Sequence, residues 1–329
     1  MPPAKRKRTE ANEEPEEPVM RSSIWYDDGS IVLEAEKTQF RVHRSVLSKY
    51  SKFFKDLFTV PQPEGELLVD GCPVVRMSDS AEDWESLLIA IYSGPQLYNS
   101  VKSYPLKLLI AMLRLGNKYD FEELRDHALA RIKLELPSKL SDWDALFQVE
   151  PEVPGEFFTA GIEFDLVNIA EELGIRSILP MAYHLCIRDQ TLDAIFNGCK
   201  RPDGTLAELS PSTRYILLRG KGALVRATLD ETFIWIMNNE FIPSGTCFSP
   251  VDCEKARVTI LEESIRSLYQ TIACALDIWD ERLTETSALC AMCQNAAQSA
   301  HQEGREIIWG ALPSYFGLPG WGDLKDFEI

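Results

Sequence analysis

Residues 28–58 read DGSIVLEAEKTQFRVHRSVLSKYSKFFKDLF, and the spacing of the apolar residues changes within this stretch. Between residues 31 and 42 the spacing is typical of two short paired strands joined by a turn. From Val46 to Phe58 it becomes the spacing of one helix face, and the pattern ends before Pro61. The stretch therefore predicts two strands followed by a helix.

The alternation of elements continues in residues 73–94, which read PVVRMSDSAEDWESLLIAIYSG. The first five residues indicate another strand, and Ser80 with an acidic Asp83 three places later resembles the capping box of a following helix. Helical spacing returns in residues 106–113 and 121–132. The predicted order is strand, strand, helix, strand and three helices, which places this part of the chain in the α+β class.

These stretches resemble the BTB/POZ family, and its fungal members in particular. The resemblance implies a small β-sheet flanked by α-helices over residues 23–136, and a domain that dimerises or recruits protein partners. BTB dimers use the first strand and helix, so dimer or partner contacts are expected at Ile24, Trp25, Tyr26, Val46 and Tyr50. The family signature is carried by Phe40, Val42, His43, Arg44, Leu47, Ser51, Phe53 and Phe54.

Composition excludes several classes of protein. The 329 residues include 51 acidic and 34 basic ones, and the formal net charge of -17 disfavours broad binding to nucleic-acid phosphates. Neither a secretory signal nor an apolar stretch of membrane-spanning length is recognised, so we expect an intracellular, soluble protein of the nucleus or cytoplasm. Without a GxSxG, GxxxxGK[ST] or HExxH motif, we expect no enzyme.

The regions outside residues 23–136 have distinct compositions. Residues 1–22 form a charged tail that we expect to be disordered. Residues 137–198 are predicted to be a helical extension, residues 199–245 a loop and helical region, and residues 246–329 a helical region that contains cysteines. The tail holds a basic run that is either a nuclear-import signal or a solvated charge block, formed by Lys5, Arg6, Lys7 and Arg8.

The spacing of the eight cysteines decides their interpretation. Disulfides are not expected in a reducing compartment, and only two pairs of cysteines fall close together. Cys247 and Cys253, with the CxxC motif of Cys290 and Cys293, can supply four thiolates for a structural zinc ion, and His301 is a substitute ligand. The alternative is that these cysteines are small packing residues of a helix.

Three functions follow from these observations. The first is a non-enzymatic adaptor that acts through BTB-mediated homodimerisation or partner recruitment. The second is a nuclear regulator whose cysteine-bound zinc module contacts nucleic acid. The third is a substrate adaptor for a cullin-type scaffold, to which residues 140–190 correspond by position, although Glu64 stands where the cullin-binding relatives have an apolar residue.

Two further patterns concern the C-terminal half. From Val258 to Trp279 apolar residues alternate steps of three and four, which favours a core-facing helix, with a short coiled coil as the alternative. The aromatic run from Ile307 to Trp321 is predicted to dock onto its own domain, with partner binding as the alternative. The sequence names no specific protein partner and no biological process.

Overall fold

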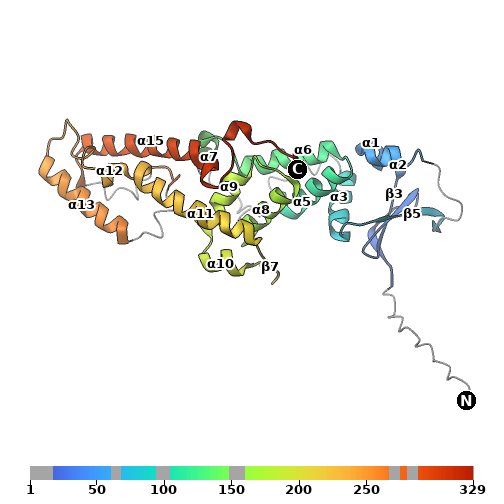
Figure 1. Cartoon of the computed structure of the whole chain (residues 1–329). Helices are drawn as coiled ribbons and strands as arrows, with labels where there is room; N and C mark the ends of the chain where they lie inside the picture. The colour runs from blue at the N-terminus through green and yellow to red at the C-terminus, as the bar shows by residue number, and fades with distance from the viewer. Residues whose placement is uncertain are drawn as a thin grey trace, which may run out of the picture. The chain divides into compact units, whose positions relative to one another are not determined.

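The computed structural model describes residues 18–60, 68–93, 104–147, 160–266, 275–279 and 288–328, with the backbone alone at residues 263–266 (Figure 1). The chain divides into two compact units, Met1–Asp126 and His127–Ile329. The division falls within one helix, and each unit is described by itself. The basic run at residues 5–8 and most of the predicted disordered tail lie outside the described residues, whereas residues 20–22 of that tail form part of a β-strand.

Unit 1 combines a small sheet with helices, as the α+β prediction requires. The predicted strands are present, together with two additional strands, β1 (Met20–Trp25) and β4 (Leu68–Val69), that the apolar pattern did not indicate, and two helices stand in place of the single one predicted from Val46 to Phe58. The elements are β1 (Met20–Trp25), β2 (Ile31–Ala35), β3 (Thr38–Val42), α1 (Arg44–Tyr50), α2 (Lys52–Leu57), β4 (Leu68–Val69), β5 (Cys72–Met77), α3 (Ala81–Ser93), α5 (Leu106–Lys118) and the start of α6 (Glu122–Glu135).

The sheet has the strand order β1-β3-β2-β5-β4. Strand β2 lies at its centre, antiparallel to β3 and parallel to β5. Ile31, Val32 and Leu33 are all fully buried, so β2 is covered on both faces. Strand β1 pairs only with β3, in parallel, and therefore forms one edge of the sheet among the described residues.

The single helix predicted from Val46 to Phe58 is wrong, because the chain breaks at Ser51. Ser51 has an extended backbone, and its buried hydroxyl accepts a hydrogen bond from the Phe54 amide at 3.0 Å, which caps α2. The same hydroxyl donates to the Tyr119 carbonyl at 2.6 Å. The break turns Phe54 into an aromatic cluster with Trp84, Tyr119 and Phe121.

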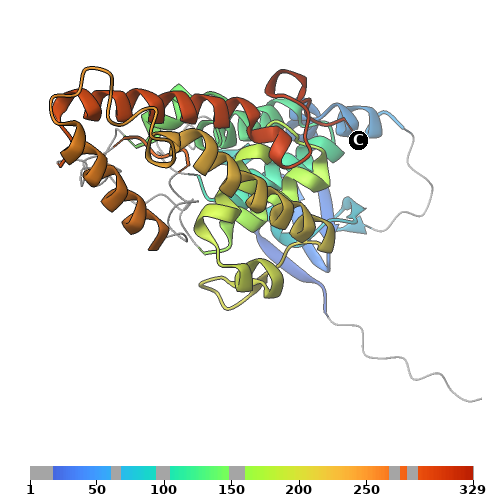
Figure 2. The same cartoon turned by 60° about the vertical axis from the view of Figure 1, so that its left-hand side comes forward.

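Unit 2 is mainly helical, as predicted for the C-terminal region. The longest helix described in unit 2 is α15 (Ala291–Tyr315), which begins directly after Cys290. It runs alongside other helices of the unit (Figures 1 and 2). The remaining elements are α7 (Leu140–Leu146), α8 (Ile162–Leu173), α9 (Leu179–Asp189), α10 (Leu192–Asn197), β6 (Cys199–Lys200), β7 (Leu206–Ala207), α11 (Pro211–Ala227), the π-helical turn η2 (Thr228–Thr232), α12 (Ile234–Met237), α13 (Pro250–Arg266) and η4 (Trp321–Asp323).

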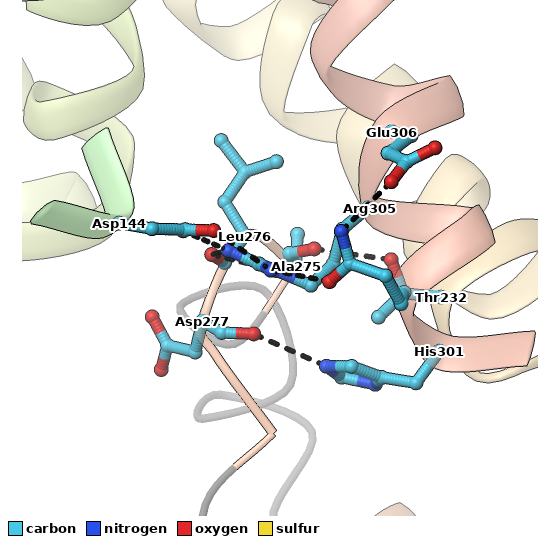
Figure 3. Close-up of polar contacts among 9 residues, drawn as sticks. Asp144, Thr232, Ala275, Leu276, Asp277, His301, Arg305 and Glu306 are labelled. Carbon is cyan, nitrogen blue, oxygen red and sulfur yellow. Dashed lines mark hydrogen bonds and ion pairs between the residues drawn. The ribbon is translucent and has the colours of Figure 1, made fainter. Parts of the chain in front are cut away.

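A buried arginine ties α15 to its surroundings (Figure 3). The guanidinium of Arg305 is 1% exposed and forms an ion pair with Asp144 of α7. It also donates to the Leu276 carbonyl at 2.9 Å and to the Gln302 side chain at 2.7 Å. The neighbouring Gly304 allows α15 to lie against η2, because a Cβ there would stand 2.5 Å from the Glu231 backbone.

The apolar seam from Val258 to Trp279 does not form one continuous helix. Helix α13 ends at Arg266, and residues 275–279 are not helical. The carbonyls of this segment instead accept hydrogen bonds from side chains of η2 and α15, including Thr232 to Ala275 at 3.0 Å. Arg305 donates a hydrogen bond to the Leu276 carbonyl, and the His301 ring lies within hydrogen-bond distance of the Asp277 carbonyl (Figure 3). In this segment, hydrogen bonds from side chains far away in the sequence therefore replace the backbone hydrogen bonds of a helix.

The predicted docking of the C-terminal aromatics is confirmed within unit 2. Trp309 is buried and stacks on Trp321 with ring centroids 5.6 Å apart, and the Trp321 indole donates to the Trp309 carbonyl at 2.7 Å. Phe316 is buried against Tyr183 and against the backbone of Gly220, where a Cβ would be 2.5 Å from its ring. Among the described residues, no helix combines the length and the apolar character needed to cross a bilayer.

We expect Arg305→Leu to lower the free energy of unfolding of unit 2 by about 3–5 kcal/mol. The reason is that the substitution leaves the Asp144 carboxylate without its buried partner and the Leu276 carbonyl without its donor. Urea unfolding followed by tryptophan fluorescence measures the change. The exposed Arg226→Leu control should change it by no more than about 0.5 kcal/mol. Equal effects of the two substitutions would contradict the role of Arg305.

Two buried histidines predict acid sensitivity. Burial lowers the pKa of His184 to about 3 and that of His301 to about 4, against an ordinary value of 6.5. Below about pH 6.5 the unfolded chain therefore binds protons that the folded chain does not, so stability falls by about 1.4 kcal/mol per pH unit for each histidine. Urea unfolding between about pH 5 and 7 measures this loss of stability. If the double variant His184→Leu/His301→Gln lost stability with falling pH as steeply as the wild-type chain, the prediction would be refuted.

Candidate functional site

Four cysteines of unit 2 converge on one point. The sulfurs of Cys247, Cys253, Cys290 and Cys293 all lie within 4.8 Å of one another, and those of Cys247 and Cys290 are 3.6 Å apart. A tetrahedral zinc ion with Zn–S bonds of about 2.3 Å separates its sulfurs by about 3.8 Å. These four cysteines can therefore hold a metal ion, and we call them the cysteine cluster.

Two helix N-termini and one loop position the cysteine cluster. Cys253 lies in the first turn of α13, where its amide donates to the Ser249 carbonyl at 2.9 Å. Cys290 is the N-cap of α15 and Cys293 lies in the first turn of that helix. In Figures 1 and 2 the start of α15 lies beside α13. The partial positive charge of both helix N-termini favours thiolates at this point.

Three sulfurs of the cysteine cluster also accept a backbone hydrogen bond. The Ser249 amide donates to Cys247 at 3.4 Å and the Cys290 amide donates to Cys253 at 3.3 Å. The Ser244 amide donates to Cys293 at 3.3 Å. The backbone amides of Cys293 and Phe248 lower the pKa of the Cys290 thiol. Charge-assisted hydrogen bonds of this kind stabilise thiolates, which are the metal-binding form of cysteine.

The surroundings make the four thiols unequal. Cys253 and Cys293 are buried, whereas Cys247 and Cys290 are partly exposed. The backbone amides of Cys293 and Phe248 hold the pKa of Cys290 at about 6, while burial raises the pKa of Cys247 to about 12. The buried side of the cysteine cluster packs against an apolar core that includes Trp235, Ile236, Ile242, Ala256, Ile260, Leu289 and Ala297.

His301 is not part of the cysteine cluster, although it was a candidate substitute ligand. Its Nε2 atom lies 3.1 Å from the Asp277 carbonyl, and the ring packs edge-on against Trp279. The remaining cysteines described by the structure, Cys72, Cys186 and Cys199, lie outside the cluster. Five residues separate Cys247 from Cys253 because Cys247 lies in the loop before α13, whereas Cys253 lies in the helix itself.

In unit 1 the signature residues differ in burial. Phe40, Val42, Leu47 and Phe54 are fully buried, whereas Phe53 is exposed at one edge. His43 links three elements: its Nδ1 atom lies 2.9 Å from the Tyr92 hydroxyl and its Nε2 atom lies 3.1 Å from Asp28. This hydrogen bond lowers the pKa of Asp28, and desolvation raises the pKa of Tyr92. His43 therefore joins the end of β3 to α3 and to the turn that contains Asp28.

Sequence reasoning missed the two partners of His43. The stretch 73–94 predicts only that Tyr92 lies in a helix, yet the Tyr92 hydroxyl accepts a hydrogen bond at 3.0 Å from the backbone amide of His43, 49 residues away in the sequence. Asp28 lies at the start of the stretch that decided the fold, but its spacing from His43 matches no local pattern. No local pattern predicts either contact, because both depend on the folding of the sheet.

The residues predicted to make dimer contacts lie on β1, on the segment that follows it, and on α1. Ile24, Trp25, Tyr26, Val46 and Tyr50 are all partly exposed. Trp25 contacts the Arg21 guanidinium, and Tyr26 stacks on Tyr92 at a centroid distance of 4.5 Å. The structure holds one chain, so their role in binding stays a prediction. The loop of residues 61–67, relevant to cullin binding, lies outside the described residues.

Comparison with protein-family models matches residues 25–134 to the BTB/POZ domain, which covers about one third of the chain. Comparisons with curated proteins and with solved structures give no match. The matched residues contain β2 with its buried signature neighbours, the break at Ser51 and the helices that complete unit 1. The chain therefore contains a BTB/POZ domain, a protein-interaction module, at residues 25–134, followed by a mainly helical region.

Proposed function

We propose that this protein is a non-enzymatic adaptor that self-associates or recruits a partner through its BTB/POZ domain. The observation that carries the proposal is the match of residues 25–134 to the family. The sheet supports it, because β1 is an edge strand whose outer side is unpaired among the described residues. Edge strands and half-exposed aromatic residues favour association with another chain.

A dimer formed through β1 and α1 makes a direct prediction. Light scattering should give about twice the chain mass of 37.3 kDa. Placing carboxylates in an apolar interface is costly, so Ile24→Asp/Val46→Asp should raise the dissociation constant by at least about a hundredfold. Ile89→Asp, at an exposed apolar position of α3, is the matched control and should leave the dimer intact. Circular dichroism confirms that each variant is folded.

A chain that stays monomeric at every concentration would reject self-association. In that case recruitment of a different protein is the remaining form of the adaptor proposal, and binding of a cullin-type scaffold by the full chain tests it. If both double variant and control dissociate equally, the interface does not involve β1 and α1.

We further propose that the cysteine cluster holds a structural zinc ion. Four sulfurs at about tetrahedral spacing, three of which accept a backbone hydrogen bond, fit a closed Cys₄ site with no open position for a substrate. The exposed residues around it include the acidic Glu240 and Asp252 and the basic Lys255. Among the described residues this mixture is not the basic surface that phosphates require, so a structural role is favoured over nucleic-acid binding.

Elemental analysis of the purified full chain should find about one zinc ion per chain. Cys290→Ser should lose most of the metal and unfold at lower temperature, because metal binding and folding of this region are coupled. Cys199→Ser, which alters a cysteine outside the cluster, is the matched control and should keep the metal. Metal retained by Cys290→Ser, or absent from the wild-type chain after purification with added zinc, would refute the site.

A further inference from the structure

Helix α11 exposes one continuous face to solvent. Counted from Tyr215, the exposed positions lie three, four, seven and eleven residues further on, which places them on the same side of the helix. The face extends over about 17 Å. We call it the α11 stripe, and it consists of Tyr215, Leu218, Arg219, Gly222 and Arg226.

The apolar part of the α11 stripe is not used by the fold. Tyr215 is 67% exposed and Leu218 is 48% exposed. The opposite side of the helix already supplies the packing residues of α11, including Leu217 and Leu224. An exposed tyrosine beside an exposed leucine is a typical anchor for a protein partner, because both bury large areas at low cost in side-chain freedom.

The charge of α11 is opposite to that of the chain. The helix carries four basic residues and no acidic one, in a protein with a formal net charge of -17. Arg219 has no carboxylate within ion-pair distance among the described residues. Arg226 is 85% exposed and its nearest carboxylate, Asp230, lies 3.6 Å away. Such exposed pairs are weak, so both guanidinium groups can bind an external carboxylate.

Gly222 lies in the middle of the α11 stripe without a packing reason. A Cβ at this position would meet no atom within 4 Å, in contrast to Gly220, which is packed against the Phe316 ring. Glycine inside a helix costs about 0.5–1 kcal/mol relative to alanine. No contact among the described residues offsets this cost. A glycine on an exposed face does, however, let another backbone approach closely.

We propose that the α11 stripe binds an acidic, helical segment of a partner protein. Carboxylates of the segment pair with Arg219 and Arg226, its apolar side chains cover Tyr215 and Leu218, and its backbone comes closest at Gly222. The net charge of the chain opposes long polyanions such as nucleic acids, whereas a short segment meets only the basic helix. This surface belongs to unit 2 and is independent of the proposed BTB dimer.

A displayed library of random peptides of about 16 residues tests the proposal, since this length covers the stripe. Selection uses the full chain, with counter-selection on Arg219→Glu/Arg226→Glu. The selected peptides should be rich in Asp and Glu, with Leu, Phe or Trp at helical spacing. A synthetic peptide of the selected sequence should bind about tenfold more weakly to the double arginine variant and to Tyr215→Ser/Leu218→Ser. Lys255→Glu/Lys325→Glu makes the same charge change elsewhere on unit 2 and should have less than about a twofold effect.

Gly222→Ala separates binding from stability. The alanine should raise the melting temperature, because helix propensity improves, and should weaken peptide binding severalfold, because its methyl group occupies the point of closest approach. Peptides without acidic enrichment, or peptides that bind all variants equally, would overturn the proposal. So would displacement of the peptide by phosphatidylserine vesicles or by a single-stranded oligonucleotide, since either result assigns the stripe to another class of ligand.

Discussion

The buried guanidinium of Arg305 is the contact on which unit 2 depends. Burial of a charge is unfavourable unless its donors are satisfied, and this guanidinium meets a carboxylate, a backbone carbonyl and an amide. The partners belong to α7, to residues 275–279 and to α15 itself. Because all three are needed to satisfy one side chain, they are held in one arrangement. Gly304, the residue before it, allows α15 to come close enough to η2 for that arrangement to exist.

The position of α15 in turn determines the cysteine cluster. Cys290 and Cys293 lie at the start of this helix, so the contacts that fix its middle also direct its N-terminus towards α13. The two remaining sulfurs come from the loop before α13 and from its first turn. A metal ion at this point would join two helices whose other contacts are made through a small apolar core. Such an ion would hold α15 at its start, as Arg305 holds it at its middle.

Unit 1 is organised by polar side chains with two roles each. Ser51 caps α2 and donates to Tyr119, and His43 joins the end of β3 to α3 and to Asp28. These contacts place the apolar signature residues in the core and leave β1 and α1 at the surface. The two units thus offer different surfaces: an edge strand with aromatic residues in unit 1, and a basic helix face on α11 in unit 2.

The sequence by itself determined the α+β class of residues 23–136, the BTB/POZ resemblance, the helical C-terminal region and the identity of the four clustered cysteines. These properties follow from apolar periodicity and from short motifs, which depend on neighbours in the sequence. Only the tertiary structure decided the break at Ser51, the end of α13 before the apolar seam is complete, the partners of His43 and the burial of Arg305. Each of these depends on groups far apart in the chain, such as Asp144 and Arg305, and a hydrogen bond or ion pair between such groups can override local helical preference. The sequence could therefore pair the cysteines by spacing, while only folding could bring all four sulfurs to one point.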